Sequence, residues 1–238
     1  MQCMKLTSAL LFTSMVVLGS SGASAVPVTL SSLTGTTGGS PAQTGVFRAD
    51  LSVAGLGNIQ SITIKDSSFG LGGAGGQFSG FDLDAIILSN TFCSTSFCAA
   101  GLTGLSVFDY SAGGTVFTPG SQRLPADPKL FGTDGTGTDI DNAIATLGLF
   151  DGNSTTAIPG ADGFVSMGDG GVLSFNLTSA VATSGLYMYL GEVGDNGEVA
   201  SGQITVSDQP VTDVPEPGTI SLMLAGLLAL MGRRRKPG

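Results

Sequence analysis

Five aspartates in two short stretches have the residue type and spacing to hold a hard cation. Asp82 and Asp84 form one group, and Asp134, Asp139 and Asp141 form the other. Calcium takes about six to eight oxygen ligands in a flexible geometry, and the glycines within DGTGTDIDN (134–142) leave backbone carbonyls free to turn inward. The stretch does not follow the EF-hand spacing, so a calcium site here is of another kind.

Both groups also have a purely structural interpretation. Asp82 and Asp84 are two residues apart on a predicted strand, so they share one face. They either flank a cation or form a solvated strand face. In 134–142, aspartate and glycine are equally typical of a turn followed by a helix cap, so both interpretations stay open.

Paired carboxylates also suit glycoside hydrolysis, but the composition argues against an enzyme. No carboxylate is set apart as a proton donor. The chain has no histidine, which excludes Ser-His-Asp and Cys-His nucleophiles and most zinc hydrolase sites. It has no tryptophan either, and Tyr110, Tyr187 and Tyr189 replace that platform for sugar rings only in part. We therefore predict that the protein is not an enzyme.

Apolar residues at every second position predict the strands that carry these side chains. In VFRADLSV (46–53) the inward set is Phe47, Ala49, Leu51 and Val53. In IQSITIKD (59–66) it includes Ile62 and Ile64. In FDLDAIILS (81–89) it is Phe81, Leu83, Ala85 and Ile87. Further strands are predicted at 104–110, 172–177, 185–193 and 202–208.

Glycine-rich breaks at 69–80, 111–121 and 167–172 separate these strands, and 31–45 is a flexible lead-in or a loose first hairpin. One short helix is predicted at about 139–148, with Asp139 at its start and Gly148 at its end. Many short strands joined by glycine turns predict an all-β fold, an antiparallel β-sandwich or jelly roll.

The N-terminal 25 residues predict a secretory signal peptide. Lys5 precedes an apolar run from Leu6 to Leu18, and Ala23-Ser24-Ala25 fits the small-x-small cleavage pattern. We expect cleavage after Ala25 by signal peptidase.

The C-terminus combines a short apolar helix with a basic tail. The apolar stretch 218–232 is shorter than the roughly 20 residues that span a bilayer comfortably. Arg233, Arg234, Arg235 and Lys236 follow directly, and such a cluster holds a tail on the cytoplasmic side. Pro215 and Pro217 mark a sharp boundary before the helix.

Val214-Pro215-Glu216-Pro217, the short helix and Arg233-Arg234-Arg235 together resemble the PEP-CTERM sorting signal. The resemblance covers about 25 residues and the signal peptide opposite, not the body of the chain. It implies recognition by a membrane-embedded exosortase, thought to cut near Pro-Glu-Pro, with the helix as a temporary anchor. A permanent tail anchor is the alternative.

The predicted organisation is a signal peptide (1–25), an exported domain (26–208), a linker (209–213) and the sorting signal (214–238). Residues 26–217 contain four basic residues and all 18 acidic ones, so this part carries a charge of about −14. Such a charge excludes nucleic acid and anionic lipid as partners and favours small cations. Cys93 and Cys98 are predicted to form a local disulfide in an oxidising compartment.

We expect an exported cell-surface or matrix protein with a structural or adhesive role among exopolysaccharides, a link that the resemblance implies. The alternative is a carbohydrate-binding module, with calcium as its one candidate cofactor and a site at Tyr187, Tyr189 and the acidic loops. A secreted glycoside hydrolase is less favoured. Expected partners are exosortase and signal peptidase during export, and polysaccharide; the membrane is contacted only through the C-terminal helix before processing.

Overall fold

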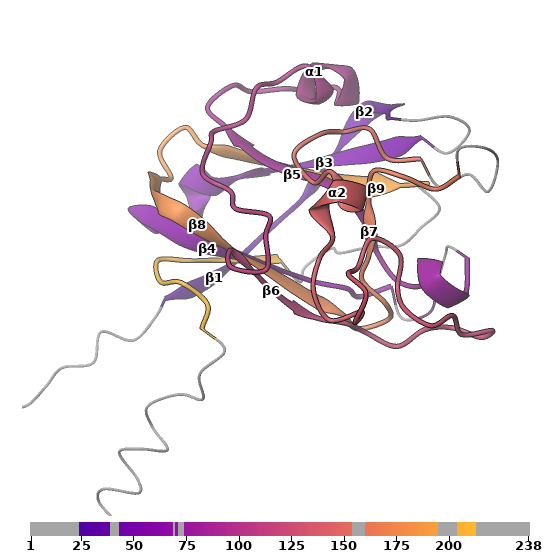
Figure 1. Ribbon diagram of the computed structural model, residues 1–238. Helices are drawn as coiled ribbons and strands as arrows, with labels where there is room; N and C mark the ends of the chain where they lie inside the picture. Colours follow the sequence, from indigo (N-terminus) through magenta and orange to yellow (C-terminus); the bar gives the residue numbers. More distant parts are fainter. Residues whose placement is uncertain are drawn as a thin grey trace, which may run out of the picture.

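The computed structural model describes residues 24–38, 43–68, 70, 74–153, 160–194 and 204–212. These residues form two antiparallel five-stranded sheets, which confirms the predicted all-β sandwich. In the view of Figure 1, sheet B lies above sheet A.

Sheet A holds the ends of the domain. Its strands, in spatial order, are β1 (Ala25–Val28), β10 (Ile204–Ser207), β4 (Asn58–Lys65), β8 (Val172–Ala182) and β6 (Thr115–Thr118). Sheet B holds the strand with the first aspartate pair. Its strands, in spatial order, are β2 (Ser31–Thr37), β3 (Thr44–Asp50), β9 (Tyr187–Val193), β5 (Asp82–Ser89) and β7 (Val165–Ser166).

The main core lies between the two sheets. Ile62, Ile64 and Phe175 come from sheet A, and Leu83 and Met188 come from sheet B; all five side chains are fully buried. The inward placement of Ile62 and Ile64 is therefore confirmed. A second apolar cluster lies on the opposite face of sheet B, where helix α1 (Ser96–Ala100) covers it. Its members are Leu33, Val46, Ile87, Cys93, Ala99 and Tyr189.

The first predicted strand ends three residues early. Strand β3 stops at Asp50, whose carboxylate accepts the Ser52 N–H at 2.9 Å and begins a 3-10 turn, η1 (Leu51–Ala54). An Asx-type cap of this kind competes with strand pairing. Ala49 and Leu51 are buried as predicted, but Val53 is 80% exposed, so its inward placement is wrong.

Strand β5 changes its buried face at a bulge. The pairing with β9 shifts between Leu83 and Ile86, so one extra residue enters the strand. Ile86 and Leu88 therefore join Leu83 in the main core, whereas Ile87 faces the second cluster. The predicted placement of Ile87 beside Leu83 is wrong for this reason.

The predicted helix 139–148 is reduced to one turn, α2 (Asn142–Ala145). Asp141 caps it instead of Asp139, accepting the Ala143 N–H at 3.1 Å. The helix ends before Gly148 because Thr146 turns left-handed at φ 42°. The side chain of Asn142 then accepts the Leu147 N–H at 3.0 Å.

Short elements account for the other differences. Residues 104–110 form no described strand and contribute one isolated bridge, Phe108 to Leu177. The glycine-rich breaks contain the short η2 (Gly76–Phe78) and β6. Strand β2 pairs with β3 within 31–45, so the first-hairpin alternative is correct there.

The two ends of the described domain lie side by side. Strand β1 pairs with β10, and the Ser24 N–H donates to Asp208 Oδ1 at 3.0 Å. In Figure 1, indigo β1 and the yellow end of the domain lie together, far from α1. Strand β1 begins at Ala25, the last residue of the predicted signal peptide, so cleavage there leaves Val26–Val28 to pair with β10.

Candidate ligand-binding site

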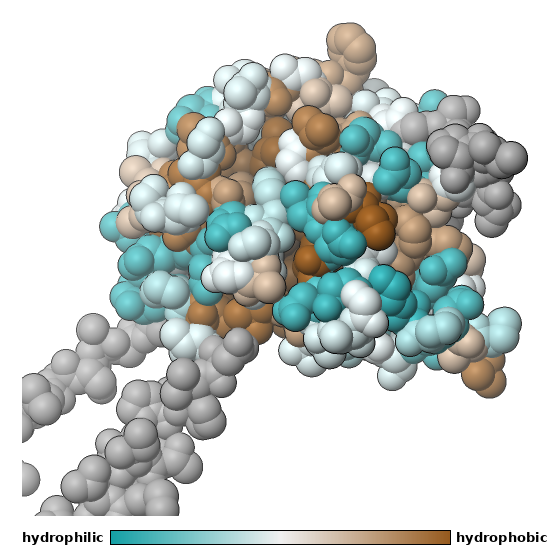
Figure 2. Space-filling view, viewed as in Figure 1, coloured by the Kyte–Doolittle hydropathy of each residue, from teal (hydrophilic) through white to brown (hydrophobic). Residues whose placement is uncertain are grey.

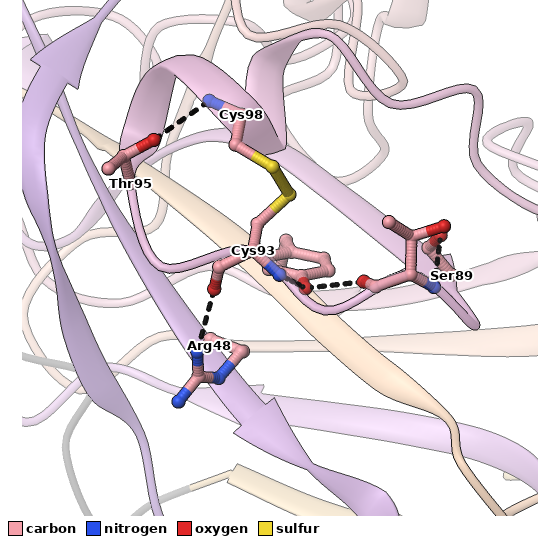
Figure 3. Close-up of a disulfide and its surroundings, with 7 residues drawn as sticks. Arg48, Ser89, Cys93, Thr95 and Cys98 are labelled. Carbon is pink, nitrogen blue, oxygen red and sulfur yellow. Dashed lines mark hydrogen bonds between the residues drawn. A yellow bond between two sulfur atoms is a disulfide. The ribbon is translucent and has the colours of Figure 1, made fainter.

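A disulfide fixes the loop above sheet B. Cys93 and Cys98 are bonded, with their Cα atoms 5.5 Å apart, which confirms the prediction. Thr95 caps helix α1 inside this loop by accepting the Cys98 N–H at 3.2 Å (Figure 3). The bond and the cap together hold the short helix on the sheet.

Tyr189 anchors the same loop from beneath. Its hydroxyl donates to the Thr91 carbonyl at 2.7 Å and accepts the Cys93 N–H at 2.8 Å. The side chain is fully buried, and this burial raises the pKa of the phenol. Tyr189 therefore offers no face to a sugar ring, and its assignment to a carbohydrate site is wrong.

Arg48 joins the loop to the open part of the sheet face. Its Nη1 donates to the Cys93 carbonyl at 2.6 Å, as Figure 3 shows, and its guanidinium carbon lies 4.1 Å from the centre of the Phe92 ring. The Phe92 ring meets Tyr187 edge to face at 5.5 Å and is 56% exposed. We call Arg48, Phe92 and Tyr187 the aromatic platform. Figure 2 shows hydrophobic side chains reaching the surface around α1.

A pocket of about 340 Å³ opens on the other side of Arg48. It is lined by Pro27, Val28, Thr29, Ser31, Arg48, Asp50, Val53 and Ala54. Arg48 and Asp50 point to the same side of β3, and in the part of the chain that the structure describes no salt bridge joins them. The pocket therefore offers a donor, an acceptor and an apolar wall, at the small end of the range of ligand sites.

Asp82 and Asp84 are both buried, so the interpretation of this pair as a solvated strand face is wrong. The two carboxylates have different hydrogen-bond partners. Asp82 accepts the Ser166 hydroxyl at 2.5 Å, whereas Asp84 Oδ2 accepts the Thr44 hydroxyl at 2.5 Å. Asp84 Oδ1 accepts the N–H groups of Asp151 at 3.1 Å and Gly152 at 2.9 Å. Burial raises the pKa of Asp84 to about 7, although the bonds from Thr44 and Gly152 lower it.

The second group closes a turn. Asp134 Oδ1 accepts N–H groups from four residues. It also accepts the Thr136 hydroxyl at 2.8 Å. Those bonds, chiefly the one from Thr136, lower the pKa of Asp134. The Lys129 ammonium donates to the carbonyls of Thr133 and Asp134. The Asp139 carbonyl accepts the Asp134 N–H at 2.9 Å.

Across the described ranges, the side chains of Asp, Glu and Cys form no group of three or more that could hold a metal. The turn-and-cap interpretation accounts for the partners of Asp134 and Asp141, and calcium stays a prediction.

Comparison with protein families identifies the end of the chain. Residues 213–236 match the model of the PEP-CTERM protein-sorting motif. The protein carries a PEP-CTERM sorting signal. No curated protein and no solved structure matches the chain.

The PEP-CTERM match confirms the resemblance and supports export by an exosortase-type system. Its residues, Val214 to Pro217 and the arginines that follow the helix, lie outside the described residues, as does the predicted helix 218–232. Among the residues that are described, no helix is long and apolar enough to cross a membrane.

The disulfide of this PEP-CTERM protein gives a first testable prediction. Replacing Cys93 and Cys98 with serine should lower the free energy of unfolding by about 2 kcal/mol, because the bond closes a loop of only a few residues. Urea denaturation of the exported domain measures this change. Adding a reductant to the wild type should give the same loss and should leave the double variant unaffected; an unchanged midpoint in both experiments would contradict the prediction.

Proposed function

We propose that the protein is an exported, non-catalytic component of the cell surface or extracellular matrix with a structural or adhesive role. The sorting signal carries this proposal, because it implies an exported protein. Signal peptidase removes 1–25, the helix at 218–232 anchors the chain for a time in the inner membrane, and exosortase acts at Pro-Glu-Pro.

The placement of the ends supports an adhesive role. The segment that leads to the membrane follows β10, at the corner where β10 pairs with β1. Helix α1, with Phe97 85% exposed, lies far from that corner in Figure 1. An anchored domain therefore presents the disulfide loop away from the bilayer.

Cell fractionation tests the proposal directly. The mature domain should be found at the cell surface or in the matrix, and its intact mass should correspond to a chain without the signal peptide and the basic tail. Recovery of the full-length chain from the cytosol would refute it.

Carbohydrate binding is the second candidate, and the pocket beside the aromatic platform favours it. Arg48 can donate to sugar hydroxyls, Asp50 can accept from them, and Phe92 offers an exposed ring face. The described lining of the pocket contains one carboxylate, Asp50, whereas glycoside hydrolysis needs two that flank the bond. This difference supports a binding role instead of a hydrolase.

Substitution of Phe92 by alanine should weaken binding to any polysaccharide that the domain retains by about tenfold, since an exposed ring contributes about 1 to 2 kcal/mol when it stacks. Affinity electrophoresis in gels that contain the polysaccharide, chosen from a glycan array, measures the effect. Leu124, which is 87% exposed and does not line the pocket, gives the matched control Leu124→Ala. Equal retention of both variants would exclude the platform as the binding surface.

A further inference from the structure

The segment after β10 stays attached to sheet A. Gln60 Nε2 donates to the Asp208 carbonyl at 2.5 Å, and the Ser61 hydroxyl donates to the Gln209 carbonyl at 2.7 Å. Both donors belong to β4. The first residues of the predicted linker 209–213 are therefore held by side chains of the neighbouring strand.

Asn176 on β8 holds the next residues more firmly. Its amide Nδ2 donates to the Val211 carbonyl at 2.9 Å, and its Oδ1 accepts the Val211 N–H at 2.7 Å. This reciprocal pair is the pattern that two backbones make in an antiparallel ladder. One side chain thus binds the linker as a strand would, although Pro210 has no N–H to offer. We call Gln60, Ser61 and Asn176 the linker clamp.

The linker clamp shortens the tether to the sorting motif. From Val211 to Pro215 is four residues, which reach about 14 Å when extended. From Ser207, the end of β10, to Pro215 is eight residues, which reach about 27 Å. A closed clamp therefore keeps the folded domain about half as far from Pro-Glu-Pro as an open one.

A processing enzyme binds its substrate as an extended segment, and residues that precede the cleavage point must be free to enter its groove. A folded domain less than about 14 Å away leaves little room for a membrane-embedded enzyme. Cleavage of a protected segment follows the population of the open form when opening is fast.

We propose that the linker clamp limits the rate of exosortase processing, because the linker must leave sheet A before the enzyme can engage the Pro-Glu-Pro segment. Asn176 is the main positioning residue, since it makes two of the four bonds. The proposal rests on processing by exosortase and is independent of what the exported domain binds.

The experiment follows the full-length chain in cells that contain the exosortase system. Pulse-labelling and immunoblotting give the rate at which precursor becomes product, and intact mass defines the product. Asn176→Ala should raise this rate about tenfold, because two hydrogen bonds that oppose opening are lost. Asn90→Ala is the matched control; it removes one amide bond, to the Gly185 carbonyl, far along the chain from the linker, and should leave the rate unchanged.

A second variant tests tether length without altering the sheet. Inserting Gly-Ser-Gly-Ser between Asp213 and Val214 should also raise the rate, and adding Asn176→Ala to it should give little further gain. If either variant is folded and is processed at the wild-type rate, the proposal is overturned. If Asn176→Ala does not fold, the insertion variant decides alone. A wild-type chain that is never processed would overturn the sorting route itself, and the clamp with it.

Discussion

Replacing Gly80 with alanine is expected to lower the free energy of unfolding by more than about 3 kcal/mol, one of the two largest effects that we predict. Gly80 has φ 79°, a conformation that alanine rarely adopts. A Cβ at this position would lie 2.4 Å from the carbonyl carbon and oxygen of Gly168. Because both atoms belong to backbone, no side chain can rotate away, and the two segments must separate.

Two other glycines distinguish the cost of backbone strain from the cost of a steric clash at a new Cβ. Gly55 has φ 73°, but no atom lies within 4 Å of the place that a Cβ would take, so Gly55→Ala should cost about 1 kcal/mol through backbone strain alone. Gly57 has neither feature, and Gly57→Ala should change stability by less than about 0.5 kcal/mol. Urea denaturation of the three variants, with an unchanged slope, measures the series. A loss for Gly80→Ala no larger than that for Gly55→Ala would contradict the argument from close approach.

The backbones of Gly80, Gly120 and Gly168 approach one another closely, and this contact joins three segments of the chain. Gly168 donates its N–H to the Ser79 carbonyl at 2.8 Å, and the Gly120 N–H donates to the Met167 carbonyl at 2.9 Å. The carboxylate of Asp66, which is buried, accepts N–H groups from Phe81 at 3.0 Å and Gly170 at 2.8 Å. The described parts of these glycine-rich breaks, which look like loose turns in the sequence, therefore contain closely packed and hydrogen-bonded backbone.

The alternation of apolar residues is sufficient to predict which side chains are buried where a strand runs without a bulge. Ile62 and Ile64 are buried as their alternation predicts. The sorting motif is also recognisable from the sequence, because its residues follow one another along the chain. The position of Ile87 is not, since the bulge that turns it away depends on pairing with β9, more than 90 residues later in sequence.

The candidate site is mostly hidden from sequence for the same reason. Arg48 and Phe92 meet because β3 passes beneath the disulfide loop, and no spacing rule connects them. One signal is present in the sequence, because a phenylalanine lies beside the six-residue cysteine loop at 92 and another lies within it at 97. Both rings are exposed in the structure. Sequence alone misplaces Tyr189 because the pairing of β9 with β5, which brings its hydroxyl to Thr91 and Cys93, is not visible along the chain.

Protonation of Asp84 should make stability depend on pH, and Asp84→Asn should remove most of that dependence. The pKa of Asp84 is about 7 in the folded protein, against an ordinary value of 3.8. Between these two values the folded state binds a proton that the unfolded state has released. The free energy of unfolding therefore falls as pH rises from about 4 to about 7 and levels off above. The group is fully buried, so the total fall from this residue should be about 2 to 4 kcal/mol.

Asparagine keeps the shape of the protonated carboxyl without its charge. Its oxygen can accept the Gly152 N–H, and its amide can donate to the Thr44 hydroxyl, which then reverses its direction. Urea denaturation of both proteins from pH 4 to pH 8 should show the wild type losing about 2 to 4 kcal/mol more than the variant. Above pH 7 the variant should be the more stable protein.

Two controls assign the effect to Asp84. Asp151 lies beside it and has a pKa raised by burial, so Asp151→Asn should leave most of the wild-type slope in place. Asp109 is exposed, and the bonds from Ser111 lower its pKa below the ordinary value of 3.8, so the stability that this group contributes is lost only as pH falls below that value. Asp109→Asn should therefore leave the slope between pH 4 and pH 8 unchanged. If the wild type and Asp84→Asn lose stability in parallel as pH rises, the buried carboxyl is not the group that titrates.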